Sequence, residues 1–196
     1  MILVIAGTDR PLSNSRKVAD YVHGIFAELG QKSQVLDLAE LKPARFEGPY
    51  YGGMVGLPTD FAAAVDLVNA ADGIYFCVPE YNGSMPGILK YFIDHWKYPD
   101  SFEFRPVAFC GLGWMFGGLR PVEHLQGVMG YRNAFMYPER IFFRDVPLHL
   151  KEKSTVDDKV LADLFQKQCS GFVRFIQALK AAGLDANSRR PPIPHL

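Results

Sequence analysis

The chain has 196 residues, an ordinary size for one domain with a core of its own. Its 21 Lys and Arg balance its 21 Asp and Glu, so its charge gives no sign of a nucleic-acid or anionic-membrane partner. No stretch approaches the roughly 18 to 20 apolar residues that span a bilayer. Three widely spaced cysteines without a CxxC motif favour a reducing, cytoplasmic setting, with the thiols buried in the core.

The N-terminal part of the chain alternates between the two periods of regular structure. Residues 2–6 are continuously apolar, which predicts a strand covered on both faces. From Arg16 the apolar spacing becomes helical, and Gly30 marks the end of that helix. Residues 34–38 are then expected to form a second strand.

The same alternation continues to the end of the chain. Further strands are predicted at residues 73–78, at 106–112 and within 134–143, the last interrupted by Pro138. Apolar residues at helical spacing predict helices between and after these strands. The residues are Phe61, Val65 and Val68 for the first helix, Leu89, Phe92, Ile93 and Trp96 for the second, and Val122, Leu125 and Met129 for the third, and a last helix is predicted over about 157–182.

Strands that alternate with helices indicate an α/β protein with a parallel sheet and right-handed crossovers. Five strands fit a three-layer, flavodoxin-like fold with sheet order 2-1-3-4-5 better than a six-stranded dinucleotide fold. Residues 1–185 are therefore expected to form a single domain. Residues 186–196 are expected to be an extended or disordered tail, because the ending SRRPPIPHL cannot continue a helix.

Three loops carry the most unusual stretches of the sequence. In a sheet of this order, ligands bind beyond the carboxyl ends of the strands, where the strand order reverses. The loops after the first, third and fourth strands should meet there. They read GTDRPLSNSRKVA (7–19), PEYNGSMPG (79–87) and GLGWMFGGLRPVEHL (111–125).

The first loop combines hydroxyls, a guanidinium and the start of a helix. Thr8, Arg10, Ser13, Ser15 and Arg16 suit a phosphate monoester. An equally open interpretation is that a serine only caps the helix and that Arg10 is solvated. The loop is neither GxGxxG nor GxxxxGK[ST], so it argues against phosphates held in those two ways.

The second loop is expected to be a rigid turn. Pro79 ends the strand because it has no N–H, Ser84 is placed to cap the next helix, and Pro86 can occupy its first turn. Between them, Glu80 and Tyr81 are singly unremarkable surface residues. Together the turn forms an edge of backbone donors and acceptors beside an aromatic face.

The third loop places Trp114, Met115 and Phe116 among four glycines. Glycine there would let the backbone approach a flat ligand. Three large apolar side chains in a loop indicate either a ligand wall or a subunit contact, and the sequence leaves both open.

One kind of ligand satisfies all three loops: a flat ring system joined to a single phosphate, such as FMN. The segment PEYNGSMPGILKYFID resembles the PEYNxSxPGxLKxxID signature of the NADPH-dependent FMN reductase family. GTDRPLSNSRKVA is similar to its GTxRxxSxSxKxA phosphate loop, and GGLRPVEHL to its GGxRxxxxL segment. The resemblance runs in order from Ile2 to about Pro138, which is roughly two-thirds of the chain.

This resemblance implies a flavodoxin-like fold with non-covalent FMN and with NADPH or NADH as electron donor. By position it assigns phosphate binding to Arg10, Ser13 and Ser15, and further to Thr8 and Arg16. It assigns the edge of the isoalloxazine ring to Pro79, Glu80, Tyr81, Asn82 and Gly83, and the other rim to the loop around Gly113 and Gly117.

Two stretches depart from the family pattern. Trp114, Met115 and Phe116 stand where the family has small residues, so the space above the ring is altered. Residues 46–57 match no part of the pattern, and their Tyr50 and Tyr51 are expected at the substrate side or at a dimer contact.

The implied chemistry belongs to the cofactor, with hydride passing from a nicotinamide to flavin N5, so no catalytic side chain is expected. The five histidines are scattered without the spacing of metal ligands, and no GxSxG turn is present. We therefore expect neither a metal site nor a protein nucleophile.

The predicted function is an FMN-dependent oxidoreductase that passes electrons from NAD(P)H to a small acceptor: a quinone, an azo compound, a metal oxyanion or free flavin. One alternative is a flavodoxin-type electron carrier, although carriers tend to be strongly acidic and this chain is neutral. Another is a flavin-binding regulatory module without nicotinamide turnover. A fold that has lost its flavin and serves as a binding or regulatory module is a third, against which the intact phosphate loop argues. The apolar loops predict a homodimer or homotetramer with shared flavin sites, and neither a nucleic-acid nor a membrane partner.

Overall fold

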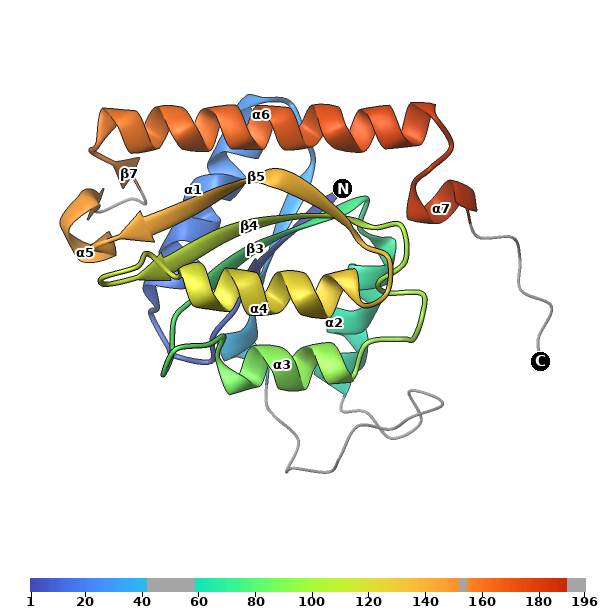
Figure 1. Cartoon of the computed structure of the whole chain (residues 1–196), viewed down its shortest axis with the longest axis horizontal. Coiled ribbons are helices and arrows are strands. Elements are labelled where there is room, and N and C mark those ends of the chain that lie inside the picture. The colour runs from blue at the N-terminus through green and yellow to red at the C-terminus, as the bar shows by residue number, and fades with distance from the viewer. Residues whose placement is uncertain (42–58, 152–154, 190–196) are drawn as a thin grey trace.

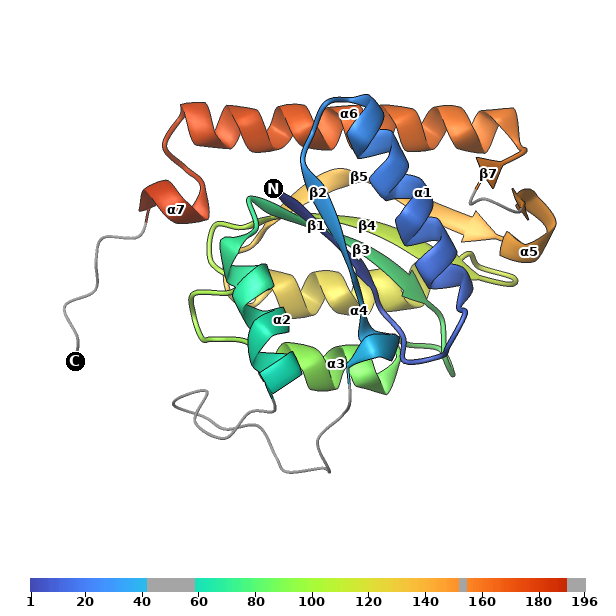
Figure 2. The ribbon, with the colours of Figure 1, turned by 180° about the vertical axis from the view of Figure 1, so that it is seen from behind.

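A parallel sheet of five strands separates two layers of helices (Figure 1, and from behind in Figure 2). The computed structural model describes residues 1–41, 59–151 and 155–189. The strands lie in the order β2-β1-β3-β4-β5, which confirms the predicted flavodoxin-like topology. They are β1 (Ile2–Ala6), β2 (Ser33–Asp37), β3 (Gly73–Pro79), β4 (Pro106–Gly113) and β5 (Phe135–Arg144).

The long helices follow the strands as the apolar spacing predicts. They are α1 (Asn14–Glu28), α2 (Thr59–Ala70), α3 (Gly87–Asp94), α4 (Leu119–Gly130) and α6 (Lys159–Ala181). Shorter elements complete the described chain, namely the 3-10 helix η1 (Leu38–Glu40), α5 (Val146–His149), the antiparallel pair β6 (Leu150–Lys151) and β7 (Thr155–Val156), and α7 (Ala186–Arg189). Residues 46–57, with Tyr50 and Tyr51, lie outside the described residues, so the expectation for them stays a prediction.

Alternate side chains of each central strand enter opposite halves of the core. Leu3, Phe76 and Phe109 belong to one apolar cluster, which α2, α3 and α4 complete. Their neighbours on the other face join the cluster under α1 and α6. Because both faces are covered, β1, β3 and β4 are almost continuously apolar, as expected of a parallel sheet.

The carboxyl ends of the strands point to one edge of the sheet. At this edge, on the left in Figure 1, α3 and α4 begin beside the ends of β3 and β4. The loop after β1 reaches the same edge before α1 begins. The three unusual loops therefore meet, as the predicted topology requires.

Strand β5 continues through Pro138 instead of being interrupted there. Its register against β4 shifts between Val107 and Phe109, and this bulge accommodates a residue without an N–H on an edge strand. The buried Gln168 side chain of α6 donates to the Phe109 and Glu139 carbonyl oxygens at 3.0 and 2.9 Å. Its amide oxygen accepts a hydrogen bond from the buried Tyr75 hydroxyl. One glutamine thus satisfies the polar groups at the bulge.

The tail differs from the prediction over its first four residues. Ala186–Arg189 form a single helical turn, α7, where an extended segment was expected. Asp185 explains the turn, because its carboxylate accepts hydrogen bonds from the Asn187 amide and the Ser188 hydroxyl. Residues 190–196 lie outside the described part of the chain.

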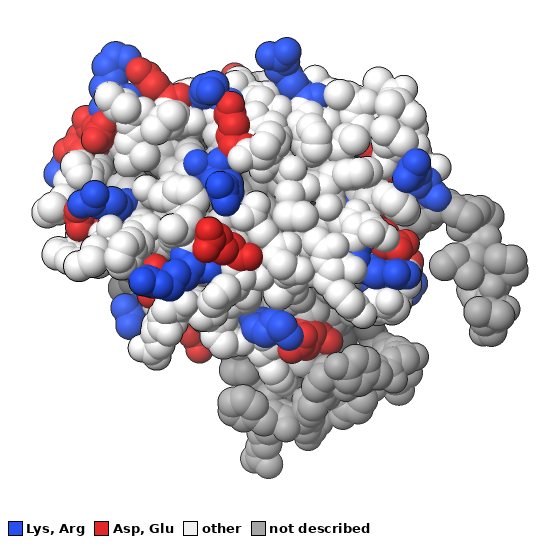
Figure 3. Space-filling model, viewed as in Figure 1, with Lys and Arg blue, Asp and Glu red and all other residues white. Residues whose placement is uncertain are grey.

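The distribution of surface charge and the burial of the thiols agree with what the composition predicts. Basic and acidic side chains are interspersed over the face in Figure 3. Cys77, Cys110 and Cys169 are free and buried, and burial raises the pKa of each thiol, so they fill the core as predicted. No helix in the described residues has the length and apolar character needed to cross a membrane.

The role of Gln168 is testable by substitution. Gln168→Leu removes the acceptor of the buried Tyr75 hydroxyl and one hydrogen bond to each of two carbonyl groups, which should lower the free energy of unfolding by roughly 2–4 kcal/mol. Gln166→Leu is the matched control, because Gln166 lies on the same helix but is exposed, with a surface hydrogen bond to Glu28. Urea unfolding followed by circular dichroism measures both. Equal midpoints for the two variants would contradict the role given to Gln168.

Candidate active site

The first loop ends in a capped helix start. The Ser13 hydroxyl accepts a hydrogen bond from the Arg16 amide at 3.1 Å and so caps α1. Ser15, in the first turn, is 1% exposed, and its hydroxyl has no hydrogen-bond partner among the described residues. The first amides of a helix also lack intrahelical partners. The loop therefore combines a helix cap, as the simpler interpretation expected, with groups that remain available to an anion.

The two arginines of this loop differ in their surroundings. Arg16 binds Asp20, Asp37 and Glu40 at 3.0 to 3.2 Å and so joins α1 to the end of β2. The hydrogen bond to Asp20 is the main cause that raises the pKa of Arg16. Arg10 is exposed and has no acidic partner within the described ranges. Arg10 is thus available to an anion, whereas Arg16 already has three carboxylates.

The second loop is a tight two-residue hairpin. The backbones of Tyr81 and Ser84 exchange hydrogen bonds of 2.9 and 3.1 Å. Between them Asn82 and Gly83 have φ angles of +50° and +80°, as in a type I′ turn. The Glu80 amide donates to the Leu112 carbonyl at 2.8 Å, which continues the pairing beyond Pro79. The predicted rigid turn is present, and Asn-Gly is the residue pair that its backbone favours.

The expected cap at Ser84 is wrong. Pro86 is the N-cap residue of α3, without a side-chain hydrogen bond, and the first helical residue is Gly87. Ser84 lies two residues earlier and is held in the hairpin, so its hydroxyl instead shares a hydrogen bond of 2.8 Å with Nδ1 of His124 on α4.

The glycines of the third loop are needed for the packing of the loop itself. Gly118 is the N-cap of α4 with a φ of +78°, and a Cβ there would lie 2.4 Å from the Leu112 amide nitrogen. A Cβ at Gly113 would lie 2.7 Å from the Gly118 nitrogen, and one at Gly117 would lie 2.9 Å from the Phe142 backbone. These glycines therefore let the loop fold back onto β4 and β5, so close packing within the chain already accounts for them.

Side-chain contacts join the three loops. Thr8 Oγ1 and Tyr81 Oη share a hydrogen bond of 2.8 Å, and the Arg10 guanidinium lies 5.2 Å from the centre of the Tyr81 ring. The Arg120 guanidinium donates to Glu80 Oε1 at 2.7 Å. Thr8 is fully buried, and its hydroxyl also accepts from the Arg10 amide. The predicted residues of the first and second loops are thus brought together, and Arg120 adds the third.

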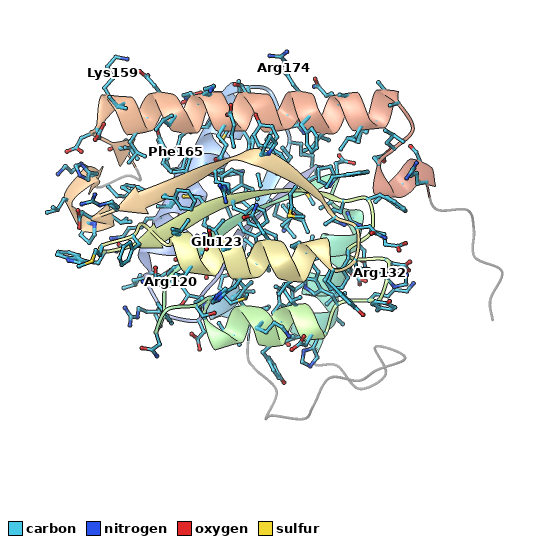
Figure 4. The ribbon with its side chains drawn as sticks, viewed as in Figure 1. Arg120, Glu123, Arg132, Lys159, Phe165 and Arg174 are labelled. Atoms are coloured by element: carbon cyan, nitrogen blue, oxygen red, sulfur yellow. The ribbon has the colours of Figure 1, made fainter. Side chains whose placement is uncertain are left out.

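An open depression of about 320 Å³ lies between the second and third loops. It is lined by Glu80, Asn82 and Gly83 on one side and by Trp114, Met115, Phe116 and Arg120 on the other. Figure 4 shows Arg120 at the first turn of α4. The apolar wall is exposed, with 73% of Trp114 and 67% of Met115 accessible to solvent. The depression can receive a flat apolar group beside one carboxylate–guanidinium pair.

Sequence reasoning missed Arg120 and His124. Both lie in the segment GGLRPVEHL, and their spacing of four residues puts them on one face of α4. That spacing could have identified them, but only the contacts with Glu80 and Ser84 show what the face meets. No group of three or more His, Cys, Asp or Glu in the described part of the chain is arranged to hold a metal ion.

Comparison with known proteins identifies the family. Residues 1–145 match the NADPH-dependent FMN reductase family. A NADPH azoreductase of Bacillus sp. (strain OY1-2) is 30% identical over 163 residues, covering 80% of this chain and 83% of that protein. A quinone reductase of Escherichia coli (strain K12) is 31% identical over 132 residues, covering 64% and 69%. The chain therefore belongs to the NADPH-dependent FMN reductase family and is an FMN-dependent NAD(P)H oxidoreductase.

Solved structures support the fold. The flavoenzyme FerB, an NAD(P)H:(acceptor) oxidoreductase from Paracoccus denitrificans, superposes with a TM-score of 0.74 at 21% identity over 90% of this chain and 97% of its own. An NADH:FMN oxidoreductase in its apo form also gives 0.74, at 18% identity over 99% and 98%. At these identities the likeness establishes the fold alone.

Proposed function

We propose that the three-loop edge binds FMN and that the reduced flavin passes electrons to a small, flat organic acceptor such as a quinone or an azo compound. The observation that supports this most directly is that contacts between side chains join all three loops around one edge. The named azoreductase and quinone reductase relatives act on acceptors of this kind. Metal oxyanions and free flavin remain further acceptors to test.

Arg10 and Ser15 are the proposed phosphate ligands. Arg10 has no acidic partner among the described residues and can form a charge-assisted hydrogen bond. The Ser15 hydroxyl and the first amides of α1 add donors at a helix N-terminus, which favours anions. Ser13 contributes by capping this helix. Thr8 holds the loop through its hydrogen bond to Tyr81, and Arg16 holds it through its ion pairs with three carboxylates.

The hairpin from Pro79 to Gly83 is the proposed contact of the flavin ring edge. Its backbone is fixed by the two Tyr81–Ser84 hydrogen bonds, so its remaining amide and carbonyl groups keep one direction. Gly113 and Gly117 shape the opposite rim through the fold of the third loop. When bound, FMN supplies the redox chemistry, and the protein supplies binding, orientation and exclusion of water. The buried, protonated thiols fit a cytoplasmic setting.

Electron transfer with nicotinamide turnover separates this function from a flavodoxin-type carrier. After loading with FMN, rapid mixing with NADPH, and separately NADH, should bleach the flavin absorbance on the timescale of turnover. Addition of a quinone or an azo dye should then restore it. A protein that binds FMN but is not reduced by either nucleotide would be a carrier or a regulatory module.

The phosphate assignment gives a quantitative expectation. Arg10→Ala should remove an interaction worth about 1.5 to 3 kcal/mol and weaken FMN affinity roughly tenfold to a hundredfold. Riboflavin, which lacks the phosphate, should bind almost unchanged. Lys17→Ala is the control, because it removes an exposed cation from the first turn of the same helix. Equal weakening of FMN and riboflavin in Arg10→Ala would refute the assignment.

A homodimer, or a tetramer built from two dimers, is part of the proposal. Trp114, Met115 and Phe116 are exposed beside the depression, and interface cores are enriched in such residues. Light scattering should give at least twice the 22.0 kDa mass of the chain. Trp114→Ser should lower that mass, whereas Tyr131→Ser, an exposed aromatic at the other end of α4, should not. A wild-type monomer with full NADPH turnover would end the idea of a shared site.

A further inference from the structure

Helix α4 contacts the hairpin of the second loop at two points. Arg120 Nη1 donates to Glu80 Oε1 at 2.7 Å, and His124 Nδ1 shares a hydrogen bond of 2.8 Å with Ser84 Oγ. The two contacts flank Asn82 and Gly83, which have the positive φ angles of the turn. Each end of the hairpin is thus tied to the same helix.

The helix provides a rigid support for these contacts. Arg120 and His124 are four residues apart on its exposed face, whereas Val122, Leu125 and Met129 are buried against the sheet. The hairpin projects beyond the carboxyl ends of the strands, where the Glu80 amide bonds to Leu112 and the Tyr81 hydroxyl bonds to Thr8. The contacts with α4 add a second support to the hairpin, at Glu80 and at Ser84.

Arg120 also contacts Phe116, an apolar residue earlier in the third loop. Its guanidinium lies 4.4 Å from the centre of the Phe116 ring, so one planar cation joins Glu80 on one side of the depression to Phe116 on the other. Arg120 therefore contacts both walls of the depression, whereas the hydrogen bond that the structure describes for the His124 side chain goes to Ser84 of the hairpin.

We propose that His124 and Arg120 are positioning residues with separate effects: His124 orients the hairpin that contacts the flavin edge, and Arg120 sets the width of the acceptor site. This inference rests on the proposed function of the three-loop edge. Neither residue needs to touch the flavin. His124 acts through Ser84, and Arg120 acts through Glu80 and Phe116.

Two substitutions of His124 separate the hydrogen bond from the bulk of the side chain. In asparagine the amide occupies nearly the place of Nδ1, whereas in glutamine it lies one carbon farther from the backbone. His124→Gln and Ser84→Ala should each weaken FMN affinity about threefold to tenfold, because one polar hydrogen bond is lost. His124→Asn should stay within about twofold of wild type by the same reasoning. Titration of the apoprotein with FMN, followed by flavin fluorescence, measures this.

Hydrogen exchange tests the orientation of the hairpin without the cofactor. In apoprotein, His124→Gln and Ser84→Ala should speed exchange of the Tyr81 and Ser84 amides relative to wild type, and His124→Asn should not. Gln126→Ala is the matched control, because it removes another side-chain hydrogen bond of α4, to Arg140 on β5. It should leave both the exchange rates and the FMN affinity unchanged.

Arg120→Lys separates the two contacts of Arg120. Lysine can keep the ion pair with Glu80, but it lacks the planar guanidinium that lies over Phe116. FMN affinity should stay within about twofold, while KM for a quinone or azo acceptor rises about threefold to tenfold with kcat little changed. A merely structural role would lower stability and kcat as well as raise KM. That result would overturn the role of Arg120.

The outcomes distinguish this inference from the proposed function. Unchanged exchange and unchanged FMN affinity in His124→Gln, in a protein whose wild type binds FMN, would overturn the role of His124 and leave the function intact. A wild type that fails to bind FMN would overturn the function, and the inference that rests on it would fall with it.

Discussion

The parallel pairing of β1, β3 and β4 is the constraint on which the rest of the structure depends. Ala6 pairs with Cys77, and Pro79 pairs with Leu112, so the three strands end at one edge of the sheet. The register of these buried, apolar strands already places the three loops side by side, before any contact between the loops forms. A polar residue in one of these loops therefore meets residues more than seventy positions away, as Thr8 meets Tyr81.

The apolar core ends at that edge, and beyond it polar contacts hold the loops together. The loops are joined by a hydroxyl pair, an ion pair and the Arg10 guanidinium over the Tyr81 ring, and Arg120 also lies over Phe116 within the third loop. These are interactions between polar or charged groups at the rim of the core. Such contacts add little to the global stability of a protein, but they fix the relative positions of the groups that face a ligand. This division explains why α4 carries both kinds of residue: its buried stripe anchors the helix, and its exposed face holds the hairpin.

The sequence predicted the sheet order and the site loops because periodicity and strand ends are local signals. It also predicted the tight turn at Asn82 and Gly83, since that residue pair has a specific backbone preference. Side-chain partners could not be predicted in the same way. Ser84 is of a residue type that caps helices but lies too far from the start of α3, and nothing in the sequence marks the three carboxylates that Arg16 meets as its partners. Only the folded arrangement decides between such partners.

The most direct test of the whole account is a crystal structure of the protein with FMN. The account predicts the phosphate within hydrogen-bond distance of the Arg10 guanidinium and the Ser15 hydroxyl, and the edge of the ring against the backbone of the Asn82–Gly83 turn. Arg16 should keep its carboxylate partners, and His124 should keep Ser84. A phosphate bound by Arg16, or a flavin bound away from the hairpin, would contradict it.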